Sequence, residues 1–215
     1  MSSRTMSRYL LTALTILTIA GHAAPASADT IHIGDNVRFI SSNGTLGGGA
    51  FGVDDLANGP GIDLLTFCLQ RTQHIDYSSI FHVGNITDYA DDDSGNDPIS
   101  NETAWIYTNF RAGLLGGYTA DAIQAAIWYL EGEWTSDAGN SAALRAAAHT
   151  AVLGGYANTD VGVINLFYQN GAKAQDQLVL RTVPQQQLNP VPEPASLMLL
   201  GSGLLAIGRG LRRRV

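Results

Sequence analysis

The stretch Leu64-Leu65-Thr66-Phe67-Cys68-Leu69-Gln70 contains the only cysteine of this 215-residue chain, and the rest of the sequence is best interpreted from it. Its apolar run, bounded by polar loops, predicts a buried strand over residues 64–70. Cys68 has no second cysteine with which to form a disulfide within the chain. In an oxidising compartment such a thiol pairs between chains, stays free, or is held in another covalent bond.

A glutamine in an apolar helix offers a partner for such a bond. The segment is Ala122-Ile123-Gln124-Ala125-Ala126-Ile127-Trp128, and Gln124 shares a flank with Ile127 and Trp128. A buried amide without partners costs about 1–3 kcal/mol, so we expect a compensating contact. Attack of a Cys68 thiolate on the Gln124 carboxamide would expel ammonia and leave an internal thioester. The two residues are 56 positions apart, so only the fold can bring them together.

The hydrophobic pattern around these segments predicts an α+β fold. Strands are expected in the first half and one strand at the end, at residues 30–33, 36–40, 50–53, 64–70, within 75–89, and 177–181. Helices are expected in between, at residues 101–115, from a Thr119 cap to 131, from Ser136 or Asp137 to 153, and from an Asp160 cap to 168. This order predicts a β-sandwich or barrel-like sheet with a helical insertion.

The N-terminus has the pattern of a secretory signal peptide. Arg4 and Arg8 precede an apolar run over residues 10–20, and Ala26-Ser27-Ala28 is a small-residue cleavage site. We therefore expect residues 1–28 to be removed, leaving one domain over residues 29–183.

The C-terminus carries a second set of signals. A Gln- and Pro-rich linker over residues 184–194 ends in Pro192-Glu193-Pro194, and residues 195–215 form an apolar stretch followed by an arginine-rich tail. This order resembles the PEP-CTERM sorting signal of Gram-negative bacteria. The resemblance implies recognition by exosortase-type machinery, a transmembrane sorting helix that holds the chain in the membrane before processing, and delivery to the envelope, the outer surface or the extracellular matrix.

The charge of the exported part excludes some classes of partner. Between residues 29 and 194, six basic side chains accompany all 19 acidic ones, for a net charge of −13. Nucleic acid and anionic membrane surfaces are therefore poor partners. The chain has a single lysine, Lys173, so few of its own amines could attack an internal thioester.

The segment Asp91-Asp92-Asp93-Ser94-Gly95-Asn96-Asp97-Pro98 is an acidic loop with two interpretations. Carboxylates at 91, 93 and 97 around a glycine could wrap a calcium ion, but the closing glutamate of an EF-hand loop is missing. The alternative is a solvated acidic turn. We assign no metal site and no cofactor to this chain.

The motifs Phe67-Cys68-Leu69-Gln70 and Ile123-Gln124-Ala125-Ala126-Ile127-Trp128 resemble those of thioester domains in bacterial surface adhesins. In that family a cysteine after an aromatic residue bonds to a later glutamine that apolar residues follow, and an α-helical part packs on a β-sheet part. The resemblance extends from about Thr30 to Arg181, although only these two motifs carry it. It implies a thioester cross-link between Cys68 and Gln124. The family is best known from Gram-positive surfaces, so a Gram-negative sorting signal is a departure.

Three classes of function follow from these patterns. The first is a surface-sorted binding or adhesion protein, not an enzyme, whose thioester captures an amine or hydroxyl on a target. The second is a non-covalent structural protein of the envelope or of an extracellular, biofilm-type matrix, with a free buried Cys68. The third is a cysteine hydrolase with His74, His82 or His149 as base, although a papain-like or caspase-like context around Cys68 is absent.

Overall fold

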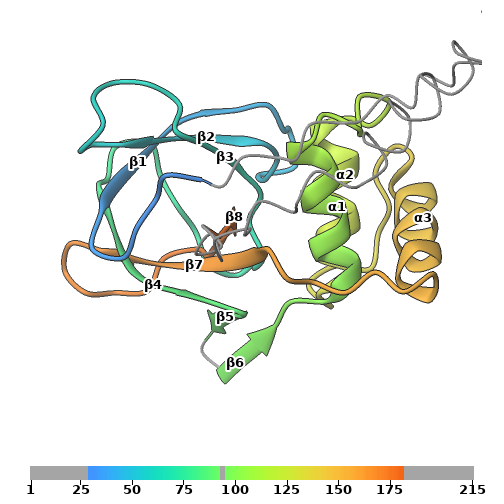
Figure 1. The fold of residues 1–215 in the computed structure, drawn as a ribbon. Helices are drawn as coiled ribbons and strands as arrows, with labels where there is room; N and C mark the ends of the chain where they lie inside the picture. Colours follow the sequence, from blue (N-terminus) through green and yellow to red (C-terminus); the bar gives the residue numbers. More distant parts are fainter. Residues whose placement is uncertain (1–28, 93–94, 182–215) are drawn as a thin grey trace, which may run out of the picture.

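The core of the protein is a six-stranded antiparallel sheet with strand order β3-β2-β1-β4-β7-β8 (Figure 1). The computed structural model describes residues 29–92 and 95–181. The strands are β1 (Asn36–Ser42), β2 (Phe51–Asp55), β3 (Leu64–Thr66), β4 (Phe81–Thr87), β7 (Val161–Tyr168) and β8 (Gln177–Leu180). On β1, Val37 and Phe39 are buried while Arg38 and Ile40 are exposed, as expected for a sheet with one face toward the core.

The two edge strands of this sheet come together, so the sheet is barrel-like. Just beyond β3, Phe67 O accepts a hydrogen bond from Leu178 N, and Leu69 N donates to Asp176 O, both at 3.1 Å. Cys68 lies between them and forms an isolated bridge with Gln177. The expected mixed fold with a sheet-rich core is confirmed, and Cys68 lies at the seam where the sheet closes on itself.

The helices form one insertion between the strands, as expected, and pack together beside the sheet (Figure 1). A small hairpin of β5 (Tyr89–Asp92) and β6 (Gly95–Pro98) leads into α1 (Asn101–Arg111), α2 (Ala120–Leu130) and α3 (Ser141–Leu153). Thr119 caps α2 as predicted, because its side chain accepts a hydrogen bond from Ala122 N. One apolar cluster joins all three helices to the strands, and it includes Phe67, Ile106, Ile127, Leu144 and Leu178.

The largest error of the sequence prediction is the helix expected over residues 160–168, which is strand β7. Residues 161–166 are all buried, because Val161 and Val163 pack in one apolar cluster and Ile164 and Leu166 in another, on the two faces of the strand. A strand covered on both faces loses the alternating pattern that distinguishes it from a helix. Asp160 is not a helix cap; its carbonyl accepts from Arg181 N at 2.8 Å.

Several boundaries also differ from the prediction. The helix expected over residues 101–115 ends at Arg111. Residues 30–33 form no strand, although Ile31 is buried. β3 ends at Thr66, so Cys68 lies just after the strand rather than within it. α3 begins at Ser141 and not at Ser136 or Asp137, because the Asp137 carboxylate instead accepts hydrogen bonds from Ser141 Oγ and the Arg145 guanidinium.

Several sequence predictions fall outside the described residues. They are the signal peptide at 1–28, the linker at 184–194 and the sorting helix at 195–215. Within residues 29–92 and 95–181, no helix has the length and apolar character needed to cross a membrane.

Candidate functional site

The structure brings Cys68 and Gln124 into direct contact in the core. Both side chains are completely buried. The sulfur of Cys68 lies 3.3 Å from Oε1 of Gln124, and Gln124 Nε2 donates to the carbonyl oxygen of Cys68 at 2.8 Å. The fold therefore places side by side two residues that lie 56 positions apart in the sequence.

Two backbone N–H groups point at the carbonyl oxygen of the Gln124 side chain. Gly49 N donates to Oε1 at 3.0 Å, and Cys68 N donates to the same atom at 3.3 Å. A pair of fixed N–H donors on one carbonyl oxygen polarises the carbonyl and stabilises negative charge that develops on it during nucleophilic attack. The arrangement thus has the form of an oxyanion hole around the carboxamide of Gln124.

A glycine-rich loop between β1 and β2 covers the Gln124 carboxamide. At Gly48 a Cβ atom would stand 2.7 Å from Gln124 Cγ and 2.8 Å from a ring carbon of Trp128, so only glycine allows this close approach. Asp121, in the first turn of α2, anchors the loop by accepting from Thr45 N at 2.7 Å and Leu46 N at 3.3 Å. Burial raises the pKa of Asp121, but these bonds and one from the Thr45 hydroxyl outweigh it and hold the pKa below its ordinary value.

Trp128 packs beside Cys68 and Gln124, and its indole N–H makes no hydrogen bond within the described residues. Trp128 lies one helical turn after Gln124, and its indole N–H is buried. The indole is nevertheless close enough to the sulfur to favour the thiolate of Cys68. Arg71 covers the outer side, with its guanidinium carbon 5.2 Å from the centroid of the Trp128 ring and 4.7 Å from that of Trp134.

The thiol of Cys68 is held in its neutral form. Complete burial raises its pKa far above the ordinary value, although the backbone N–H of Cys68 and the Trp128 indole act against this rise. A neutral thiol at this position donates its proton toward Gln124 Oε1. The sulfur therefore lies beside the carboxamide as a neutral thiol that is buried away from solvent, and it is not a reactive surface thiolate.

A buried carboxylate fixes the strand end that carries Cys68. Asp176 accepts hydrogen bonds from Gln70 Nε2, Asn165 Nδ2, and the backbone N–H groups of Asp91 and Leu166. Asp176 N also donates a hydrogen bond to Gln70 Oε1 at 3.0 Å. These two residues therefore hold the two edges of the sheet together two positions after Cys68. Burial raises the pKa of Asp176 to about 6, against the effect of these bonds.

The three histidines considered as catalytic bases are all exposed. His82 is exposed on β4, and His149 is exposed on α3 with its Nδ1 3.2 Å from Glu102 Oε1. His74 lines a cavity that also includes Gly48. None of the described histidines hydrogen-bonds to Cys68, so the contacts of the thiol do not reproduce a hydrolase dyad.

The acidic segment adopts a hairpin rather than an open ion-binding loop. Asp91 lies on β5 and pairs with Lys173 at 2.9 Å, while Asp97 is exposed on β6. Asp93 falls outside the described residues. The residues that the structure does describe contain no group of three or more His, Cys, Asp or Glu side chains placed to hold a metal ion.

Sequence reasoning missed the loop, its anchor Asp121 and the Gln70–Asp176 clamp. The run Gly47-Gly48-Gly49 was the one available signal for the loop, because adjacent glycines mark a close backbone approach as well as a turn. In the sequence, Asp121 indicates only a favourable charge in the first turn of a helix.

Comparison with known proteins identifies the C-terminal signal. Residues 190–214 match the PEP-CTERM protein-sorting motif, which includes Pro192, Glu193 and Pro194. The chain carries a PEP-CTERM sorting signal. The PEP-CTERM motif implies an exosortase substrate that is exported to the cell surface or the extracellular space of a Gram-negative bacterium.

No curated protein and no solved structure matches the chain. Its likeness to thioester domains therefore rests on the two short motifs around Cys68 and Gln124, and on no similarity across the domain.

Proposed function

We propose that Cys68 and Gln124 form an internal thioester, and that this exported protein uses it to capture a nucleophile on a surface or matrix target. The observation that carries the proposal is the arrangement around Gln124 Oε1, which receives two backbone N–H groups and lies 3.3 Å from the sulfur.

In the cross-linking step, the sulfur of Cys68 replaces the amide nitrogen on the side-chain carbonyl carbon of Gln124. Cys68 Sγ bonds to Cδ of Gln124, the Cδ–Nε2 bond breaks, and the thiol proton leaves with Nε2 as ammonia. Negative charge that develops on Oε1 in the tetrahedral intermediate is stabilised by Gly49 N–H and Cys68 N–H. A thioester is a better acyl donor than an amide, so an incoming amine or hydroxyl can take the acyl group and release the Cys68 thiol.

The apolar surroundings support the same proposal because a thioester must be shielded from water until its target arrives. Phe67, Ile127 and Trp128 are buried around the pair. The PEP-CTERM signal sends the chain to the surface or beyond it, where a covalent bond holds a partner against dilution. The proposed role is therefore adhesion or binding with a single covalent event, and not turnover of a substrate.

The decisive experiment is the intact mass of the naturally processed, exported protein. The thioester predicts a mass one ammonia lighter than the processed sequence, and a shift to the methylamide after treatment with methylamine. A Cys68→Ala variant, which keeps Gln124, provides the control and should show the full sequence mass with no methylamine adduct. Full sequence mass in the gently handled wild type, with an intact glutamine at position 124, would remove the proposal.

That result would favour a structural matrix protein with a free buried thiol, and one observation suits that alternative. Both polar atoms of the Gln124 carboxamide already have hydrogen-bond partners without a cross-link, because Nε2 donates to Cys68 O and Oε1 accepts from Gly49 N. The intact mass separates the two functions directly.

A further inference from the structure

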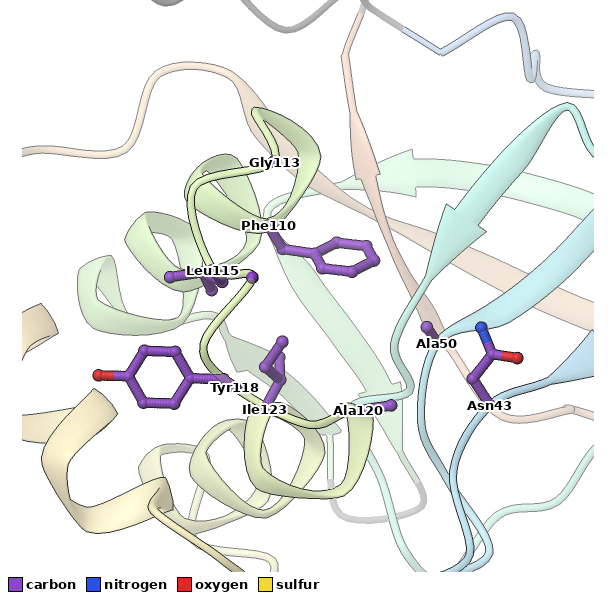
Figure 2. A pocket seen from close by; sticks show the side chains of 9 residues that line it. Asn43, Ala50, Phe110, Gly113, Leu115, Tyr118, Ala120 and Ile123 are labelled. Carbon is purple, nitrogen blue, oxygen red and sulfur yellow. The ribbon is translucent and has the colours of Figure 1, made fainter.

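Two cavities flank the glycine-rich loop that covers Gln124. One, of about 340 Å³, lies against the start of α2 and the end of α1, and apolar side chains such as Phe110, Leu115 and Ile123 project into it (Figure 2). The other, of about 420 Å³, lies on the side of Gly48 and is lined mostly by polar groups. Each of these two cavities is a candidate approach for a nucleophile that must reach the acyl carbon.

The polar cavity is the one that borders the reactive carbon. Gly48 lines it, and the Cα of this residue faces Gln124 so closely that a Cβ would stand 2.9 Å from Cδ, the carbon to be attacked. A single glycine backbone therefore separates this cavity from the acyl group. Gly47 and Gly49, on either side, have φ values of 81° and 127°, which favour glycine, so no side chain thickens this wall next to Gly48.

The chemistry of the cavity wall indicates what it would hold. Its polar lining side chains are Ser42, Thr45, His74, Tyr77 and Gln175. No described lining residue is an aspartate or glutamate that would attract an ammonium group, although the domain as a whole is strongly acidic. Hydroxyl, amide and imidazole groups around a half-exposed tyrosine ring suit a neutral, polyhydroxylated molecule.

We propose that the polar cavity is the acceptor site of the thioester, that it takes a hydroxyl group of a saccharide-like molecule, and that His74 is the base for the transfer. The inference rests on the proposed thioester. An amine attacks an acyl group as its free base, whereas a hydroxyl needs a neighbouring base to remove its proton. Among the described lining residues, His74 is the one that carries an imidazole, a side chain that can accept a proton and return it.

In the transfer step, the proton and the acyl group pass between groups that the site itself supplies. The hydroxyl oxygen bonds to Gln124 Cδ while its proton passes to the imidazole of His74. The bond from Cδ to Cys68 Sγ then breaks, and the departing thiolate takes the proton back from His74. The products are an ester on the side chain of residue 124 and a neutral Cys68 thiol, with His74 unchanged.

The test compares glycerol and methylamine as acceptors for the exported, processed protein, followed by intact mass over time. In wild type we expect glycerol to add with its full mass to the thioester form. His74→Ala should slow the addition of glycerol about 100-fold and change the addition of methylamine less than twofold. His149→Ala, which removes an exposed histidine on α3, is the matched control and should change neither rate.

The main contacts that involve His74 in the fold use its backbone carbonyl, which accepts from Tyr168 Oη and Gln175 N, so the alanine variant keeps them. Gly116→Trp tests the other approach, because this position lies on the apolar cavity and has open space around it. Equal glycerol rates in wild type and His74→Ala, or a loss of glycerol addition in Gly116→Trp instead, would overturn the inference. A wild type without the ammonia deficit would overturn the thioester itself, and with it this inference.

Discussion

The backbone N–H of Gly49 donates to Oε1 of Gln124 at 3.0 Å, across 75 residues of sequence. This bond ties the loop between β1 and β2 to the middle of helix α2. It also gives the Gln124 carbonyl a donor that is already in position before any chemistry takes place, so little reorganisation is needed when charge develops. The loop is therefore part of the site and not merely its cover.

Replacing Gly48 by alanine should damage both the fold and the cross-link. The added methyl would stand 2.7 Å from Gln124 Cγ and 2.8 Å from the Trp128 ring, and both neighbours are packed in the core. We expect a loss of about 1–3 kcal/mol in the free energy of unfolding, as is usual when a packed core is overfilled. Urea unfolding measures this loss, and intact mass measures the fraction of cross-linked protein.

Gly116→Ala provides the control for this change, because a Cβ at position 116 meets no atom within 4 Å. It should unfold at the same urea concentration as wild type. If Gly48→Ala matched the control in both stability and mass, the close approach of the loop to Gln124 would be wrong.

Replacing Trp128 by phenylalanine should separate stability from reactivity. The change removes a buried N–H that has no partner among the described residues, so the lost ring volume and the lost desolvation penalty partly cancel. We expect less than about 1.5 kcal/mol of change in stability. The cross-link should form more slowly, because the indole no longer favours the thiolate of Cys68.

The rate of ammonia loss after refolding, followed by mass, measures the effect of Trp128→Phe. Trp134→Phe is the matched control, since Trp134 packs edge to face against Trp128 with ring centroids 5.8 Å apart and also contacts Arg71, but it is not among the groups that shift the pKa of Cys68. Identical rates for the two variants would show that the indole N–H of Trp128 plays no part in forming the bond.

The pairing of Cys68 with Gln124 could be predicted because each residue is a chemical exception within its own apolar segment. The residues that organise the pair could not. Gly48 and Gly49 belong to a loop without hydrophobic periodicity, and their function depends on approach to a helix 75 residues later. Asp176 precedes a short strand, where a lone aspartate in sequence is typical of a turn and gives no sign of being buried.

The fold class could be predicted from the order of strands and helices, whereas strand β7 could not be distinguished from a helix. The segment Val161-Gly162-Val163-Ile164-Asn165-Leu166 is rich in β-branched residues, which favours a strand. Its continuous burial, however, comes from apolar clusters that cover both of its faces, one with Val163 and the other with Ile164, and that packing is set by tertiary structure. An apolar run of this length gives no periodicity by which to choose.

Replacing Asp121 by asparagine should loosen the loop and alter the pH dependence of stability. Hydrogen bonds from Thr45 and Leu46 hold the pKa of Asp121 below its ordinary value of 3.8. A lowered pKa in the folded state means that the stabilising contribution is present above 3.8 and is lost as the pH falls through the folded value. The free energy of unfolding of wild type should therefore fall as the pH is lowered through this acid range. In Asp121→Asn, which has no carboxylate at this position, this part of the fall should be absent.

Thermal unfolding at a series of pH values from 2 to 5 compares the two proteins, and hydrogen exchange of residues 44–49 reports the mobility of the loop directly. We expect faster exchange in Asp121→Asn at neutral pH. Unchanged exchange, together with parallel pH curves, would show that the carboxylate does not anchor the loop.

Replacing Asp176 by alanine should open the seam that carries Cys68. Four donors lose their acceptor, namely those of Gln70, Asn165, Asp91 and Leu166. Because each buried donor left unpaired costs about 1–3 kcal/mol, we expect a loss of at least about 3 kcal/mol. Cross-link formation should fall with it, since Gln70 no longer fixes the backbone two residues after Cys68. Urea unfolding and intact mass measure the two effects.

The pH dependence of Asp176 has the opposite sign to that of Asp121. Burial raises the pKa of Asp176 from 3.8 to about 6, so the folded state holds the proton more tightly than the unfolded chain. Stability from this group is present below pH 3.8 and is lost as the pH rises toward 6. Asp176→Asn cannot titrate and should abolish that part of the slope, while its side-chain oxygen retains some of the acceptor contacts. A wild-type curve that is flat between pH 4 and 6, after subtraction of the Asp176→Asn curve, would show that the carboxylate is ionised throughout and that its four donors outweigh its burial.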